Sequence, residues 1–153
     1  RIRLLVIGRG TKEKQLLTDP TRAMGLEDVV IHTGYRIEDY VDVVSCMDID
    51  VFLVPGSDGS CRAVREVMAM GKPVIAANRG MLPEIVDNDI NGLVVEDTPE
   101  NMAEAFLKLS RDENLRNKLA EASLNKAREK FSLDTQAIQV EKVYEELLSE
   151  GNQ

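Results

Sequence analysis

The chain is poor in the residues that build metal sites and disulfide frameworks. Its 153 residues include no tryptophan, one histidine (His32) and two cysteines (Cys46 and Cys61). A single histidine excludes a histidine-rich metal site, and neither cysteine has a second cysteine at the Cys-x-x-Cys spacing. Two isolated cysteines favour a reducing compartment over a secreted disulfide scaffold. We therefore expect a cytoplasmic protein without a histidine- or cysteine-based metal site.

Long apolar runs and excess positive charge are also missing. No run approaches the ~20 apolar residues of a membrane-spanning helix, and we see no secretory signal peptide. A strand-like run follows Arg1 almost at once, so we expect a piece of a longer polypeptide. The net charge of −8 argues against binding of nucleic acid or of an anionic membrane. A phosphate ligand is compatible with this charge, because exposed charges more than ~8 Å away are largely screened.

Five short apolar runs alternate with helix-like segments along the chain. The runs are residues 3–7, 29–33, 51–55, 74–77 and 93–96. This alternation predicts βαβ units in one α/β domain, residues 1–153, with a Rossmann-like parallel sheet and helices on both of its faces. The runs are continuously apolar, as in strands that are covered on both sides. No strand-like run follows residue 96, so we expect helices from there to residue 148.

Local signals predict where several helices begin and end. Four polar residues are predicted N-caps: Asp19, Thr98, Asp112 and Ser132. A further helix is predicted to begin near Ser60 and to end at Gly71. The last helix is predicted to carry an apolar stripe of Leu133, Ala137, Val140, Tyr144 and Leu147.

The most informative segment is the strand–loop–helix at residues 51–77. In a parallel sheet, ligands bind at the carboxyl ends of the strands. Here such an end is followed by Asp58-Gly59-Ser60 and then by a predicted helix. The free N–H groups of the first helical turn suit a phosphate, and Arg62 in that turn offers a charge-assisted bond.

With these motifs the chain resembles the C-terminal, donor-binding domain of retaining GT-B glycosyltransferases, the "group 1" family. The family signature has an E-x7-E pattern, with Glu-Gly-Phe-Gly before the helix and Glu-Ala-Met-Ala-x-Gly-x-Pro-Val within and after it. This chain has Asp58-Gly59-Ser60-Cys61 and then Glu66-Val67-Met68-Ala69-Met70-Gly71-Lys72-Pro73-Val74. Segments at residues 6–10, 30–35, 80–86, 91–95 and 131–132 also resemble the family, with His32 where an aromatic residue is usual.

The resemblance implies roles for the matching residues. Asp58 and Glu66 would be the catalytic acids, with Asp58 on the hydroxyls of the transferred sugar and Glu66 on the ribose of the nucleotide. Further contacts with the nucleotide-sugar donor would come from Gly8, Gly10, Tyr35, Arg36, Gly59, Ser60, Cys61 and Arg62. Arg62 is expected to supply positive charge to the diphosphate. The resemblance implies no divalent metal and no cofactor.

The resemblance also implies a partner domain. An N-terminal acceptor-binding domain of the same polypeptide would complete the enzyme, so this chain alone would be inactive. Two other functions stay open at this point: a nucleotide-sugar epimerase or phosphorylase related to GT-B enzymes, and a flavodoxin-like regulatory module. Structural interpretations also stay open, since Arg62 and Glu66 could simply pair on a helix surface and His32 could be a packed strand residue.

Overall fold

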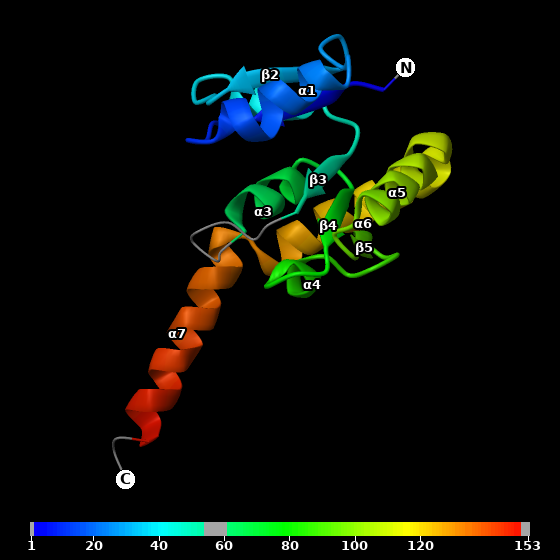
Figure 1. Cartoon of the computed structure of the whole chain (residues 1–153). Helices are drawn as coiled ribbons and strands as arrows, with labels where there is room; N and C mark the ends of the chain where they lie inside the picture. Colours follow the sequence, from blue (N-terminus) through cyan, green and yellow to red (C-terminus); the bar gives the residue numbers. More distant parts are fainter. Residues whose placement is uncertain (1, 54–60, 151–153) are drawn as a thin grey trace. The chain divides into compact units, whose positions relative to one another are not determined.

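The computed structural model describes residues 2–53 and 61–150. It divides the chain into two compact units, unit 1 (Arg1–Met47) and unit 2 (Asp48–Gln153) (Figure 1). Both units contain parallel strands and helices, which confirms the predicted α/β class. The strands belong to two sheets, one in each unit.

Unit 1 is built on a parallel pair of strands, β1 (Leu4–Ile7) and β2 (Val30–Gly34). The register shifts between Val6 and Ile7, where Ile7 lies opposite Gly34. Parallel strands need a crossover connection, and here it contains the π-helical segment η1 (Lys14–Thr18) and the helix α1 (Asp19–Ala23). The short helix α2 (Tyr40–Ser45) follows β2.

Unit 2 is built on a three-stranded parallel sheet. Its strands are β3 (Asp50–Phe52), β4 (Val74–Ala77) and β5 (Gly92–Val95), with β4 in the centre. Between them lie α3 (Arg62–Ala69) and α4 (Leu82–Ile85). The chain continues as α5 (Pro99–Arg111), α6 (Glu113–Lys130) and α7 (Leu133–Glu150). The helices α3, α5 and α6 contact the strands, and α3 also packs on α6.

The core of unit 2 surrounds its central strand. All four residues of β4 are buried, as the continuous apolar run predicts for a strand covered on both faces. Large side chains from the neighbouring helices are fully buried too: Met68, Leu82, Ile85, Leu109 and Leu119. Each contributes ~1.5–3 kcal/mol through removal of its apolar surface from water.

Three of the four predicted N-caps are confirmed. Thr98, Asp112 and Ser132 each accept a hydrogen bond from the backbone N–H three residues later, at 3.3, 2.9 and 3.1 Å. The prediction for Asp19 is wrong, because Asp19 is already helical and follows the helical turns of η1 without a break. A proline at the next position therefore marks a junction between helical segments here.

The helix α3 ends as predicted. Gly71 has a φ of 68° and follows the last turn, a conformation that favours glycine after a helix. The helix begins at Arg62, after Cys61. The predicted start near Ser60 lies outside the described residues.

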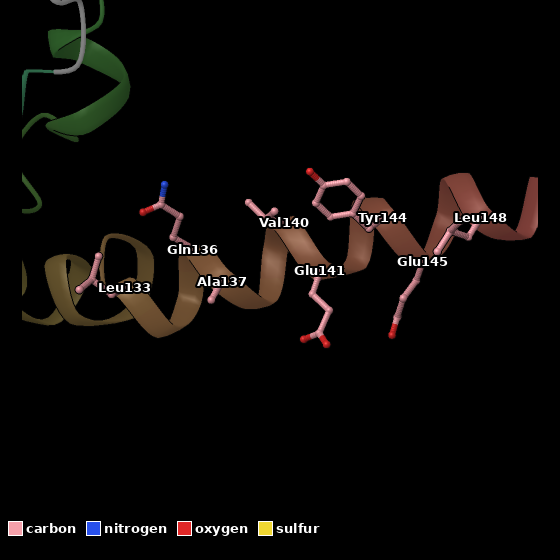
Figure 2. A pocket seen from close by; sticks show the side chains of 8 residues that line it. All are labelled: Leu133, Gln136, Ala137, Val140, Glu141, Tyr144, Glu145 and Leu148. Carbon is pink, nitrogen blue, oxygen red and sulfur yellow. The ribbon is translucent and has the colours of Figure 1, made fainter.

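The predicted apolar stripe of α7 is exposed. Leu133, Val140, Tyr144 and Leu147 all have large exposed fractions. A shallow depression runs along this helix and is lined by residues of α7 alone (Figure 2). Val140 and Tyr144 lie on one side of the helix in this view, and Glu141 and Glu145 on the other.

Candidate functional site

Two of the predicted donor-binding residues, Cys61 and Arg62, lie at the start of α3. Cys61 precedes the helix in a left-handed conformation (φ 49°, ψ 42°), and its side chain is 2% exposed. The Cys61 carbonyl accepts hydrogen bonds from the N–H groups of Val64 and Arg65, at 3.1 and 3.4 Å. The Cys61 carbonyl therefore closes the first turn of the helix. The predicted residues Asp58, Gly59 and Ser60 lie outside the described residues.

Glu66 and Arg62 lie one turn apart on α3 and form an ion pair. Arg62 Nε donates to Glu66 Oε1 at 2.8 Å. The side chain of Arg62 is 81% exposed and that of Glu66 is 37% exposed. The pair uses one of the five N–H donors of the guanidinium and one oxygen of the carboxylate, so both side chains keep capacity for a ligand. An exposed pair at this spacing stabilises a helix by ~0.2–0.5 kcal/mol.

The carboxyl end of the sheet in unit 1 holds the predicted glycine turn. Gly8 has a φ of 125° and Gly34 a φ of 69°, conformations that side chains disfavour. The N–H of Gly8 donates to the carbonyl of Gly34 at 2.9 Å. The carbonyl of Gly10 accepts from the N–H of Glu13 at 3.2 Å, which closes a turn before η1.

Tyr35 and Arg36 follow directly after β2, at the same end of the sheet. The Tyr35 side chain is exposed, and the guanidinium carbon of Arg9 lies 5.6 Å from its ring centroid. This is a cation–π arrangement between the two loops. Arg36 forms a two-pronged pair with Asp39, in which Arg36 Nε donates to Asp39 Oδ1 at 2.8 Å. Gly8, Gly10, Tyr35 and Arg36 therefore gather at one end of unit 1.

Sequence reasoning missed the contacts that His32 makes in this unit. His32 Nε2 lies 2.8 Å from the Gly8 carbonyl oxygen, and His32 Nδ1 lies 3.0 Å from Glu13 Oε1. His32 is thus the partly buried strand residue that the structural interpretation expected, with both ring nitrogens engaged. The available signal was the replacement of a usual aromatic by the only histidine of the chain.

The carboxyl end of the sheet in unit 2 holds two further polar pairs. Arg79 Nη2 lies 2.5 Å from Asp97 Oδ2, and Asn78 Nδ2 donates to Glu96 Oε1 at 2.9 Å. These residues follow β4 and β5. The pairs tie the two loops to each other across the end of the sheet.

Asp50 is a titratable residue whose buried environment changes its pKa. It opens β3, at the end of the strand opposite to the ligand-binding end, and its side chain is buried. Burial raises the pKa of Asp50 from 3.8 to about 6, and a hydrogen bond with the Val51 backbone opposes this. Within the described residues, Asp50 Oδ2 has no hydrogen-bond partner. Asp50 therefore lies at the end of β3 opposite to the proposed donor contacts of unit 2.

The described ranges lack both a metal-binding cluster and a membrane-spanning helix. Residues 2–53 and 61–150 contain no group of three or more His, Cys, Asp or Glu side chains placed to hold a metal ion. In the same ranges, no helix has both the length and the apolar character to span a membrane.

Comparison with known proteins identifies the family. Residues 1–126 match the profile of the family "Glycosyl transferases group 1". The uncharacterized glycosyltransferase MJ1178 of Methanocaldococcus jannaschii is 40% identical over 109 residues, which are 69% of this chain and 31% of that protein. The chain spans about a third of the length of the curated relatives that it matches.

Solved structures share the fold. Anabaena Alr3699/HepE in complex with UDP-glucose superposes with a TM-score of 0.83 at 21% identity, over 94% of this chain and 41% of that chain. The C-terminal domain of a glycosyl transferase group 1 family protein (LpcC) from Francisella tularensis superposes with a TM-score of 0.71 at 25% identity, over 86% of this chain and 70% of that chain. Both the profile match and the shared fold lead to one conclusion: the chain belongs to the group 1 glycosyltransferase family.

Proposed function

We propose that this chain binds the nucleotide-diphospho-sugar donor of a glycosyltransferase that retains the configuration of the transferred sugar. One observation carries the proposal. Glu66, the second acid of the family signature, lies on α3 with its carboxylate accessible and only one of its oxygens engaged by Arg62. An ionised carboxylate can accept hydrogen bonds from the two vicinal hydroxyls of a ribose. The complex of HepE with UDP-glucose supports this class of ligand by analogy of fold.

The chemistry assigned to the chain is electrostatic. In sugar transfer from such a donor, the nucleoside diphosphate leaves as an anion, so groups that stabilise its charge lower the barrier. Arg62 would supply such charge through its free N–H donors, together with the backbone N–H groups at the start of α3. Asp58 would hold the transferred sugar, and Gly8, Gly10, Tyr35 and Arg36 would add donor contacts. The proposal requires no metal ion and no cofactor.

The proposal includes a longer polypeptide. The chain spans about a third of its curated relatives, and the solved C-terminal domain of LpcC matches most of it. We propose that the chain is the donor-binding half and that an N-terminal domain of the same polypeptide binds the acceptor. Transfer then needs both halves, so this chain alone is expected to be inactive.

The test is calorimetric titration of the full-length polypeptide with uridine, guanosine and adenosine diphosphates, with and without magnesium. We expect one nucleotide to bind, and Glu66→Gln to weaken it by roughly 10- to 100-fold, because a hydrogen bond to a charged group contributes ~1.5–3 kcal/mol. Glu121→Gln, on the exposed face of α6, is the matched control and should bind as the parent does.

Failure of all three nucleotides to bind would count against the proposal. If the Glu66→Gln variant binds the nucleotide as tightly as the parent does, Glu66 does not contribute to donor binding. An epimerase would convert a nucleotide sugar without any acceptor, whereas the proposed transferase would release the nucleotide diphosphate only when it transfers the sugar. The family match argues against the regulatory flavodoxin-like alternative.

A further inference from the structure

His32 joins the two ends of the loop that carries the glycine turn. The loop comprises residues 8–13, between the end of β1 and the start of η1. His32 Nε2 contacts the Gly8 carbonyl at its first residue, at 2.8 Å. His32 Nδ1 contacts the Glu13 carboxylate at its last residue, at 3.0 Å. One side chain on β2 therefore holds both ends of a loop that lies about 20 residues away in sequence.

The two partners of His32 place one oxygen atom against each ring nitrogen. A carbonyl oxygen and a carboxylate oxygen are both acceptors, so each hydrogen bond requires an N–H on the imidazole. A neutral imidazole has one N–H, whereas the protonated ring has two. Both ring nitrogens therefore face an oxygen atom, and the placement of hydrogen on the ring sets which nitrogen donates.

The loop needs such support because of its composition. Gly8 adopts a φ of 125°, and Gly10 adds a second residue without a side chain. Glycine loses more backbone freedom on ordering than any other residue. A loop that is ordered before its ligand arrives avoids part of the entropic cost of binding. The stacking of Arg9 on Tyr35 adds a third attachment of this loop to the end of β2.

We propose that His32 is a positioning residue that holds residues 8–13 in their donor-binding conformation, an inference that rests on the donor-binding role proposed above for Gly8 and Gly10. Both ring nitrogens are engaged within unit 1, and the side chain is 24% exposed. His32 thus acts through the loop and does not contact the reacting atoms.

The experiment compares four variants in the full-length polypeptide. His32→Phe keeps an aromatic ring of similar shape and removes both hydrogen bonds. Glu13→Ala removes one bond at a side chain that is 37% exposed. Glu13→Gln keeps an acceptor oxygen for Nδ1 and should rescue the contact. Glu27→Gln, an exposed change in unit 1, is the control.

Three measurements are made on each variant. Amide hydrogen exchange of residues 8–13 without ligand should be faster in His32→Phe and Glu13→Ala than in the parent, and unchanged in the control. The Kd of the nucleoside diphosphate should rise about 5- to 10-fold in the same two variants, less than the loss of a direct hydrogen bond to a charged group would cause, because His32 acts only through the loop. In turnover, the KM of the donor should rise while kcat stays near that of the parent.

The outcomes separate this inference from the proposed function. If the parent binds no nucleoside diphosphate, the proposed function fails whatever His32 does. If the parent binds and folded His32→Phe and Glu13→Ala bind equally well, only the positioning role fails. Unchanged exchange in residues 8–13 would also overturn it.

Discussion

The roles proposed for Arg62 and Glu66 assign two parts of one ligand to a single turn of α3. The pair joins Arg62 Nε to Glu66 Oε1 at 2.8 Å, on an exposed part of α3. The contact leaves Glu66 Oε2 and most of the guanidinium N–H groups available. Arg62 can therefore act on the diphosphate directly or only through Glu66, and the two roles differ in which ligands feel its loss.

Replacement of Arg62 by alanine distinguishes the two roles. We expect Arg62→Ala to weaken binding of the nucleoside diphosphate about tenfold, because a charge-assisted bond to phosphate is lost. Binding of the same nucleoside without its phosphates should change by less than about twofold, since the ion pair itself contributes only ~0.2–0.5 kcal/mol. Calorimetry with both ligands checks this. Unchanged diphosphate affinity would refute a direct role for Arg62.

The backbone conformation of Cys61 gives a physical reason for one glycine of the family signature. It stands where the signature has its second glycine, and its φ of 49° lies in the left-handed region. A side chain there costs roughly 1–2 kcal/mol. In this chain the cysteine is buried, so apolar burial offsets part of that cost.

At the scale of elements, the sheet of unit 2 depends on the close approach of two strands. Gly92 opens β5 and lies opposite Val74 of β4. A Cβ at Gly92 would lie 2.3 Å from the Val74 carbonyl oxygen and 2.6 Å from Val86 Cγ1. Both neighbours belong to the buried core, and one of them is backbone. The preceding Asn91 is buried as well, and its Oδ1 accepts from the N–H of Asp87, which fixes the turn into β5.

Gly92→Ala should therefore destabilise unit 2. Overpacking of a core costs ~1–3 kcal/mol, and we expect the upper part of this range because the carbonyl of β4 would have to move. Urea denaturation measures the loss in free energy of unfolding. Gly10→Ala is the matched control, because a Cβ there meets nothing within 4 Å and the backbone is not left-handed. Equal stability of the two variants would contradict the close approach of β4 and β5.

At the scale of the whole molecule, the pH dependence of stability is expected to reflect Asp50, an acid that is buried in a chain of net charge −8. Burial raises the pKa of Asp50 from 3.8 to about 6 in the folded chain. The folded state therefore holds this proton more tightly than the unfolded state. The resulting stabilisation is fully present below pH ~4 and is lost as the pH rises through about 6. A shift of about two pKa units corresponds to roughly 3 kcal/mol.

Asp50→Asn should remove this pH dependence. The difference in free energy of unfolding between variant and parent should move by roughly 3 kcal/mol in favour of the variant between pH 4 and pH 7. Urea denaturation across this range measures it. Asp48→Asn, an exposed neighbour, should show no such trend. A constant difference between Asp50→Asn and the parent would show that Asp50 is not titrating in this window.

Much of the fold was predictable because its signals are local. The apolar run at residues 74–77 is a buried strand with those bounds, and Asp112 caps a helix as its position indicates. The spacing of Arg62 and Glu66 predicted their pair. The helical character of Asp19 was missed, because η1 before it has no cap or proline signal. The contacts of His32 with Gly8 and Glu13 were missed because they join residues 24 and 19 positions apart.

The sequence by itself determined the α/β class, the family and the residues to examine, because strand runs, caps and the spacing of acids act over a few positions. Only the tertiary structure decided which residues meet. It brought His32 to both ends of the glycine loop, buried Asp50 at the start of β3, and left the apolar stripe of α7 exposed. Burial and long-range hydrogen bonds depend on how the elements pack, and that packing involves positions far apart in the chain.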